Sequence, residues 1–76
     1  MKRRYYWTED RHVGRLEEAN GQYEKAEVLR DGKWQETTPA ELIWNANPIT
    51  RKEAIVNLIK YVRDPVTEEE ALRLLA

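Results

Sequence analysis

The sequence predicts one small α+β domain, an N-terminal antiparallel β-meander of three to four strands packed against two to three short C-terminal α-helices, which cover one face of the sheet. Two observations carry this prediction. In the first half, short stretches of mixed apolar and charged residues are separated by Asn-Gly and Asp-Gly pairs, which is typical of β-hairpins. In the second half, three Thr-x-x-Glu signals each precede apolar residues, which is typical of helix starts. The chain has 76 residues and is therefore treated as a single domain, residues 1–76.

The clearest strand signal is the Asp-Gly pair at positions 31 and 32. A two-residue hairpin turn there places Leu29 opposite Trp34, as a close cross-strand pair that anchors the inner face. It also places Arg30 opposite Lys33, so we expect both of these like charges to point into water.

The Asn-Gly pair at positions 20 and 21 predicts a second hairpin, and a turn at Glu9-Asp10 pairs Arg4–Trp7 with the next strand. Counting back from the Asn-Gly turn places Gly14 opposite Glu27 and His12 opposite Leu29. The two faces of the sheet then follow from the alternation of side chains along a strand. One face is expected to hold His12, Leu16, Tyr23, Leu29 and Trp34, and the other Val13, Ala26 and Val28.

Residues 8–19 have a competing interpretation as a helix. Thr8 is a possible N-cap, Glu9 and Asp10 suit a first helical turn, and Gly21 suits a C-terminal cap. The apolar face of such a helix is thin, and Gly14 lies in its interior. We therefore favour a strand for this segment.

The helices of the second half begin at Thr38, Thr50 and Thr67, each of which precedes a glutamate by three residues. The first helix is predicted to be short, because the Asn-Ala-Asn-Pro segment at 45–48 interrupts it. Asp64-Pro65 separates the second helix from the third. Ile49 and Val66 are placed to pack against Ala54 and Ala71 as hydrophobic staples.

The second helix is predicted to span Arg51–Arg63 and to carry the centre of the packing. Its apolar residues fall on one face at helical spacing. The third helix is apolar and has no C-terminal cap, so it must dock on the domain or on another chain to be stable. The predicted core residues are Ile55, Leu58, Ile59 and Val62 in the second helix, and Ala71, Leu72, Leu74 and Leu75 in the third.

The composition offers little catalytic chemistry. Serine and cysteine are absent and His12 is the only histidine, so the common nucleophile–base arrangements lack their residues. The carboxylates are scattered or lie in first helical turns, where they favour the helix dipole. We therefore expect no enzyme activity, no metal site and no small-molecule cofactor. No secretory signal or membrane-spanning segment is recognised, and we expect a cytoplasmic protein with no membrane partner.

Binding is the class of function that the residues favour. Thirteen Lys and Arg against 14 Asp and Glu give a net charge of −1, which argues against a general nucleic-acid binder. Seven aromatic residues are many for so small a core, so at least one of Tyr6, Tyr23, Trp44 and Tyr61 should be exposed. The preferred prediction is a non-catalytic binding or regulatory module that acts through protein–protein contacts, alone or as a homodimer.

The alternative is a nucleic-acid-binding module that uses the basic and aromatic N-terminal segment 2–7. Arginines beside aromatic rings hold phosphates and stack on bases. Strand alternation places Tyr5 and Trp7 on one face and Tyr6 on the other, so that Tyr5 and Trp7 are either core residues or a stacking platform. The candidate contacts with a partner or with nucleic acid are Arg3, Arg4, Tyr6, Arg11, Arg15 and Trp44.

Overall fold

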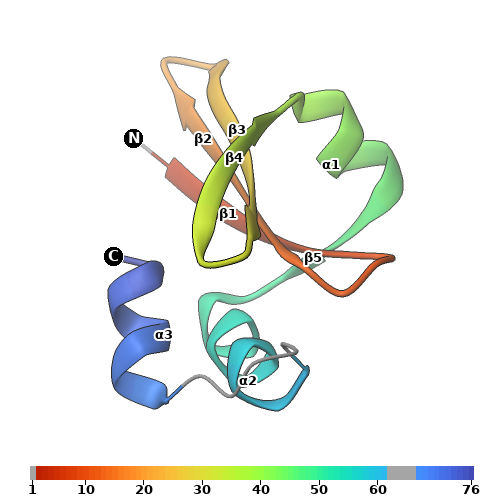
Figure 1. The fold of residues 1–76 in the computed structure, drawn as a ribbon. Coiled ribbons are helices and arrows are strands. Elements are labelled where there is room, and N and C mark those ends of the chain that lie inside the picture. The colour runs from red at the N-terminus through yellow and green to blue at the C-terminus, as the bar shows by residue number, and fades with distance from the viewer. Residues whose placement is uncertain (1, 62–66) are drawn as a thin grey trace.

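The computed structural model describes residues 2–61 and 67–76 and confirms the α+β class. Within these residues, one antiparallel sheet of five strands packs against three helices (Figure 1). The strands are β1 (Lys2–Thr8), β2 (Val13–Ala19), β3 (Gln22–Arg30), β4 (Lys33–Thr37) and β5 (Ala46–Ile49). The helices are α1 (Pro39–Asn45), α2 (Arg51–Tyr61) and α3 (Glu68–Leu74).

The sheet has the order β4-β3-β2-β1-β5. Its first four strands form the predicted meander, and residues 8–19 belong to β1, a turn and β2, so the helical interpretation of that segment is wrong. The chain then crosses through α1 and returns as β5 to the free side of β1. This fifth strand was not predicted, because an Asn-Pro pair normally marks a break. An edge strand tolerates proline, since one of its sides needs no hydrogen-bond donor.

Both Gly-containing hairpin turns are present as predicted. The two central residues of each turn have positive φ, with 54° and 76° at Asn20 and Gly21 and 52° and 74° at Asp31 and Gly32. Two consecutive positive values define the turn that matches the twist of a β-hairpin. The register of β3 and β4 is also as predicted, with Leu29 opposite Trp34.

The predicted register of β2 and β3 is wrong beyond the turn. The pairing shifts between Glu17 and Glu18, so that Gly14 lies opposite Val28 and not opposite Glu27. A one-residue shift exchanges the faces on which the following side chains lie. Val13 therefore shares a face with Leu29, and Leu16 shares the other face with Ala26 and Val28. His12 is not in the sheet but in the turn before β2.

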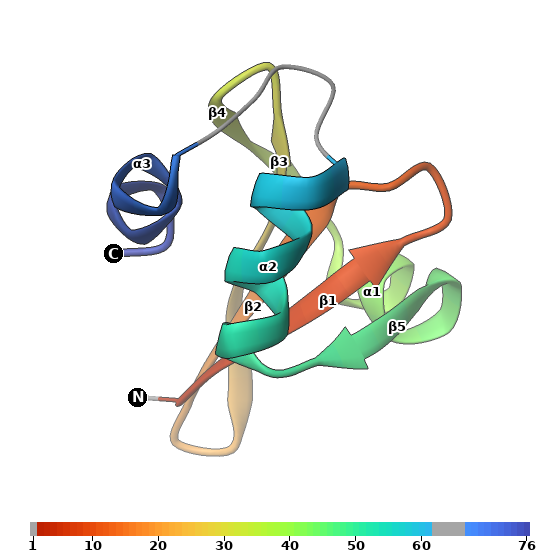
Figure 2. The ribbon, with the colours of Figure 1, turned by 90° about the horizontal axis from the view of Figure 1, so that it is seen from below.

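Helices cover both faces of the sheet, whereas the sequence suggested that only one face would be covered. Figures 1 and 2 show α1 on one side of the strands and α2 with α3 on the other. Each side has its own buried cluster. The α1 side contains Tyr6, Leu16, Ala26, Val28 and Leu42, and the other side contains Tyr5, Val13, Leu29, Ala54, Leu58, Ala71 and Leu75.

All three threonine caps are present. The hydroxyls of Thr38, Thr50 and Thr67 each accept a hydrogen bond from the main-chain N–H three residues later, at 3.1–3.2 Å. At Thr50 the bond is reciprocal, because Glu53 accepts from the Thr50 N–H at 3.1 Å. This pair forms a complete capping box at the start of α2.

The buried stripe of α2 is rotated relative to the prediction. Ala54 and Leu58 are fully buried, whereas the predicted core residue Ile59 is 39% exposed. The side chains at 54 and 58 lie one turn apart and face the sheet directly, which leaves Ile59 on the flank of the helix. The remaining predictions for 62–66, namely the end of α2 with Val62, the Asp64-Pro65 separator and the Val66 staple, lie outside the described residues.

The third helix docks on its own domain. Ala71 and Leu75 are buried against the sheet. Two aromatic side chains of the sheet donate to carbonyls at its C-terminal end, Trp34 Nε1 to Leu74 at 2.8 Å and the Tyr5 hydroxyl to Leu75 at 3.1 Å. The last carbonyls of a helix have no partner within it, so these donors serve as its missing C-terminal cap.

Candidate functional site

The aromatic residues of the N-terminal segment are mostly core residues. Tyr5 is 5% exposed, and its hydroxyl is bound to α3. Trp7 is half-buried beside Tyr61, with the two ring centroids 6.1 Å apart. Tyr6 points to the α1 side and is 6% exposed, so the expectation that Tyr6 offers a contact surface is not met. Tyr5 therefore has no free face on which a base could stack.

Two of the candidate arginines are committed to bonds within the domain. Arg3 forms an ion pair with Glu17 at 3.0 Å and donates to the Leu75 carbonyl at 3.3 Å. The Tyr5 hydroxyl and Glu17 raise the pKa of the Arg3 guanidinium above its ordinary value. Arg15 forms an ion pair with the buried Glu27 at 2.7 Å.

Arg15 also lies over the Trp34 ring, with its guanidinium carbon 3.9 Å from the ring centroid. Such stacking is a stabilising cation–π contact. Only 13% of the Arg15 side chain is exposed, and only 9% of that of Glu27. Arg15 is therefore part of the packing between β2, β3 and β4 and is not an outward-facing cation.

The two exposed candidate arginines lie at opposite ends of β1. Arg4 is near the start of the strand, 54% of its side chain is exposed, and it is 3.8 Å from Glu18. Arg11 is exposed in the turn that follows the strand, with φ of 61°. They are separated by the length of β1, so the predicted basic residues do not form one continuous patch.

The same turn also contains Asp10, whose carboxylate has two hydrogen-bond partners. Asp10 accepts a hydrogen bond from the Thr8 hydroxyl at 2.6 Å and from Arg30 at 2.7 Å. These bonds lower the pKa of Asp10 from 3.8 to about 2, with the Thr8 bond as the larger cause. Arg30 therefore pairs with Asp10 and does not simply point into water beside Lys33.

Trp44 is the most exposed of the large apolar residues among residues 2–61 and 67–76. Its side chain is 81% exposed at the end of α1, and its neighbour Ile43 is 40% exposed. The opposite side of the helix carries Leu42, which is 1% exposed. Residues two apart in a helix point in roughly opposite directions, so the burial of Leu42 places Trp44 on the outer face. The expectation that at least one of Tyr6, Tyr23, Trp44 and Tyr61 is exposed is confirmed, since all of them except Tyr6 are exposed.

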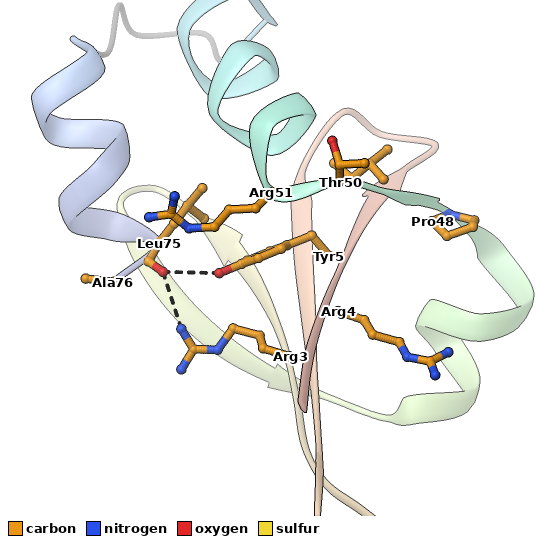
Figure 3. A pocket seen from close by; sticks show the side chains of 9 residues that line it. Arg3, Arg4, Tyr5, Pro48, Thr50, Arg51, Leu75 and Ala76 are labelled. Carbon is orange, nitrogen blue, oxygen red and sulfur yellow. Dashed lines mark hydrogen bonds between the residues drawn. The ribbon is translucent and has the colours of Figure 1, made fainter. Parts of the chain in front are cut away.

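A hollow of about 660 Å³ lies where β5 gives way to α2, next to the start of β1 (Figure 3). The sequence did not predict this hollow, because its walls come from three segments of the chain that lie far apart in sequence, at 3–5, 48–51 and 75–76. The only local signal was the helix start at Thr50. The residues that line the hollow are Arg3, Arg4, Tyr5, Pro48, Ile49, Thr50, Arg51, Leu75 and Ala76.

In comparisons with known proteins, no family model, no curated protein and no solved structure matches the chain. Across residues 2–61 and 67–76, no three His, Asp or Glu side chains lie together as a metal site would require. In the same residues, no helix has the length and apolar character needed to cross a membrane. The surface geometry is therefore the basis for the functional argument.

Proposed function

We propose that this chain is a small non-catalytic binding module that acts through protein–protein contacts, with the outer face of α1 as its contact surface. The observation that carries the proposal is Trp44, whose large apolar ring is 81% exposed beside Ile43. Tryptophan is strongly enriched among the residues that dominate binding energy at protein interfaces. A surface that presents Trp44 and Ile43 together gains apolar contact when a partner covers it.

The helix that carries Trp44 is fixed to the sheet by packing. The α1 helix begins at the Thr38 cap, and Leu42 packs it into the sheet. Gly14 on β2 makes room for this packing, because a Cβ there would lie 2.5 Å from a Leu42 methyl group. A side chain that is held on a fixed element loses little conformational freedom on binding. This favours α1 over a mobile loop as a binding element.

Self-association is the simplest version of this proposal and is tested first. Sedimentation equilibrium of the wild-type chain should give a mass that increases with concentration, and Trp44→Ala should reduce the association. Tyr23→Ala is the matched control, because Tyr23 is an exposed aromatic residue on a hairpin, 52% exposed. A wild-type chain that stays monomeric at high concentration would exclude the homodimer.

A separate partner is tested by cross-linking. A photoreactive amino acid in place of Glu41, which is exposed on the same face of α1 as Trp44, should form one stoichiometric adduct in native extract, and the same amino acid in place of Tyr23 should not. Addition of an excess of unlabelled wild-type chain should abolish the adduct, whereas addition of Trp44→Ala should not. Adducts of equal yield at both positions, or none at either, would contradict α1 as the contact surface.

The proposal includes a cytoplasmic location. A chain without cysteine is compatible with a reducing compartment.

The nucleic-acid alternative has less support. The burial of Tyr5, together with the ion pairs of Arg3 and Arg15, takes away the stacking platform and two of its cations. Its test is a titration with single- and double-stranded oligonucleotides at low salt. Salt-dependent binding that is weakened by Arg4→Gln would favour the alternative over the protein-binding proposal.

A further inference from the structure

The two neighbouring strands at the hollow, β1 and β5, differ in length. Strand β1 starts at Lys2, whereas β5 pairs only with Tyr5–Thr8 and ends opposite Tyr5 at Ile49. The chain then leaves the sheet to begin α2. Residues Lys2–Arg4 are therefore paired with β2 on one side, and no described strand lies on their other side.

Pro48 reveals which main-chain groups face this open side. It lies opposite Tyr6, and proline has no N–H, so the two residues must form a non-hydrogen-bonded pair. By alternation, Tyr5 and Trp7 direct their N–H and C=O groups toward β5. Two residues earlier, Arg3 directs its main-chain groups toward the same side, where β5 has already ended.

The side chains around this open edge are basic above an apolar floor. Of the residues that line the hollow, Arg3, Arg4 and Arg51 carry positive charge and none is Asp or Glu. Figure 3 shows Arg3 and Arg51 on either side of the Tyr5 ring, while Arg4 points away toward the other face of the sheet. The buried Tyr5 and Leu75 contribute the apolar part.

The three arginines differ in how far they are already engaged. Arg3 is bound to Glu17 and to the Leu75 carbonyl. Arg4 has only the long contact with Glu18, at 3.8 Å. Arg51 is exposed and forms no ion pair with any residue in the described part of the chain. A ligand would therefore meet the charges of Arg4 and Arg51 and the main chain of Arg3.

We propose that an extended acidic segment of a partner protein binds here as a short added strand beside Lys2–Arg4. Its main chain pairs with Arg3, as in other cases where a peptide extends an exposed sheet edge. Successive side chains of a strand point to opposite faces, so two adjacent acidic residues would reach Arg51 on one face and Arg4 on the other. The hollow has room for a few side chains, which fits a peptide better than a single ion. This surface is separate from Trp44, so the two proposals can fail independently.

The test uses the full chain, uniformly labelled with nitrogen-15, and three blocked hexapeptides. The first is acetyl-Thr-Val-Glu-Glu-Val-Thr-amide, and the second replaces both glutamates by glutamine. The third keeps the glutamates but is N-methylated along the edge that would pair with β1. We expect only the first to shift the amide signals of residues 2–5 and 49–51 in a saturable way.

Two charge variants separate specific from general attraction. Arg4→Gln/Arg51→Gln should weaken binding of the acidic peptide about tenfold, which corresponds to the loss of two partly exposed ion pairs. Lys33→Gln/Arg11→Gln removes the same charge from positions away from the hollow and should leave the affinity within about twofold. Equal weakening by both pairs would show attraction by net charge alone and would overturn the site.

The remaining outcomes also decide the proposal. Equal binding of the glutamine peptide would overturn the role of the arginines, and equal binding of the methylated peptide would overturn strand addition. Absence of any peptide binding would overturn the proposal as a whole. If single-stranded oligothymidylate shifts the same amide signals and the acidic peptide does not, the site takes nucleic acid and the proposed partner class is wrong.

Discussion

On the α1 side of the sheet, the seven-residue helix α1 covers a buried apolar cluster. Among the described residues, no side-chain hydrogen bond joins this helix to the sheet. On the other side, the polar ends of Tyr5 and Trp34 and the guanidinium of Arg3 all reach the last carbonyls of α3. The first face therefore depends on the fit of apolar shapes, whereas the second also depends on directional bonds from the sheet to a docked helix.

The difference follows from what each helix can offer. Helix α1 presents Leu42 to a space that exists only because residue 14 is glycine. Helix α3 ends inside the domain, and its unpaired carbonyls would be costly without donors. Substitutions on the α1 side should therefore change stability through side-chain volume, whereas substitutions on the α2 and α3 side should change it through lost hydrogen bonds.

The largest effect is expected from the buried ion pair on the α2 and α3 side. Arg15→Met leaves Glu27 buried with only the long contact to Lys25 at 3.6 Å, and should lower the free energy of unfolding by about 3 kcal/mol. Urea denaturation followed by circular dichroism measures this loss. Arg15→Met/Glu27→Leu should recover most of it, because no unpaired buried charge is left. A double variant as unstable as the single one would show that Arg15 acts through its stack on Trp34.

The next effect tests the shape of the α1 side. Gly14→Ala places a methyl group against Leu42 and should lower the free energy of unfolding by about 2 kcal/mol, since Leu42 is 1% exposed and has little space to move. The effect should be smaller in a Leu42→Ala background, where the new methyl group fills part of a cavity. A double-mutant cycle by urea denaturation measures this coupling. Simple additivity would contradict a direct contact between Gly14 and Leu42.

A smaller effect is expected from the hydroxyl that caps α3. Tyr5→Phe removes one hydrogen bond to the Leu75 carbonyl, which keeps its bond from Arg3, and should cost about 1 kcal/mol. Amide hydrogen exchange should become faster in α3 than in β2 or β3, because the lost bond holds this helix to the sheet. Tyr23→Phe is the control, since Tyr23 is exposed. Equal acceleration across the sheet would mean that α3 does not open separately.

The parts of this fold that could be predicted are those set by neighbouring residues. The Asn-Gly and Asp-Gly turns require positive φ, which Gly and Asn accept at little cost. The three threonine caps depend on residues only three positions apart. Alternation along β1 also predicted correctly that Tyr5 and Tyr6 lie on opposite faces.

The parts that could not be predicted depend on distant pairing. The bulge near Glu17 moves Val13 and Leu16 to faces opposite to those expected, and no sequence pattern in β2 predicts this bulge. The environments of Arg3 and Arg15 depend on Leu75 and Glu27, which are 72 and 12 residues away. Arg51 reaches the start of β1 only because the unpredicted β5 runs back along that strand. Local patterns therefore described the elements well and the candidate site poorly.

The smallest effect is expected from Asp10, which belongs to neither buried cluster and therefore serves as a reference for the predictions on the two faces. Asp10 joins the β1–β2 turn to Arg30, and its pKa in the folded chain is about 2 against an ordinary value of 3.8. Because the folded state binds this proton less readily, the carboxylate stabilises the fold above about pH 4, and that contribution is lost as the pH falls toward 2.

A pKa difference of this size would correspond to about 2 kcal/mol, but 55% of the Asp10 side chain is exposed and solvent screens its charge, so we expect well under 1 kcal/mol. Urea midpoints measured between pH 7 and pH 2 should fall by slightly less in Asp10→Asn than in the wild type, and the difference should arise below pH 4. Arg30→Gln should reproduce only part of this change, since the Thr8 hydroxyl still binds the carboxylate. Identical pH profiles for the wild type and Asp10→Asn would show that the turn does not contribute to stability through this charge.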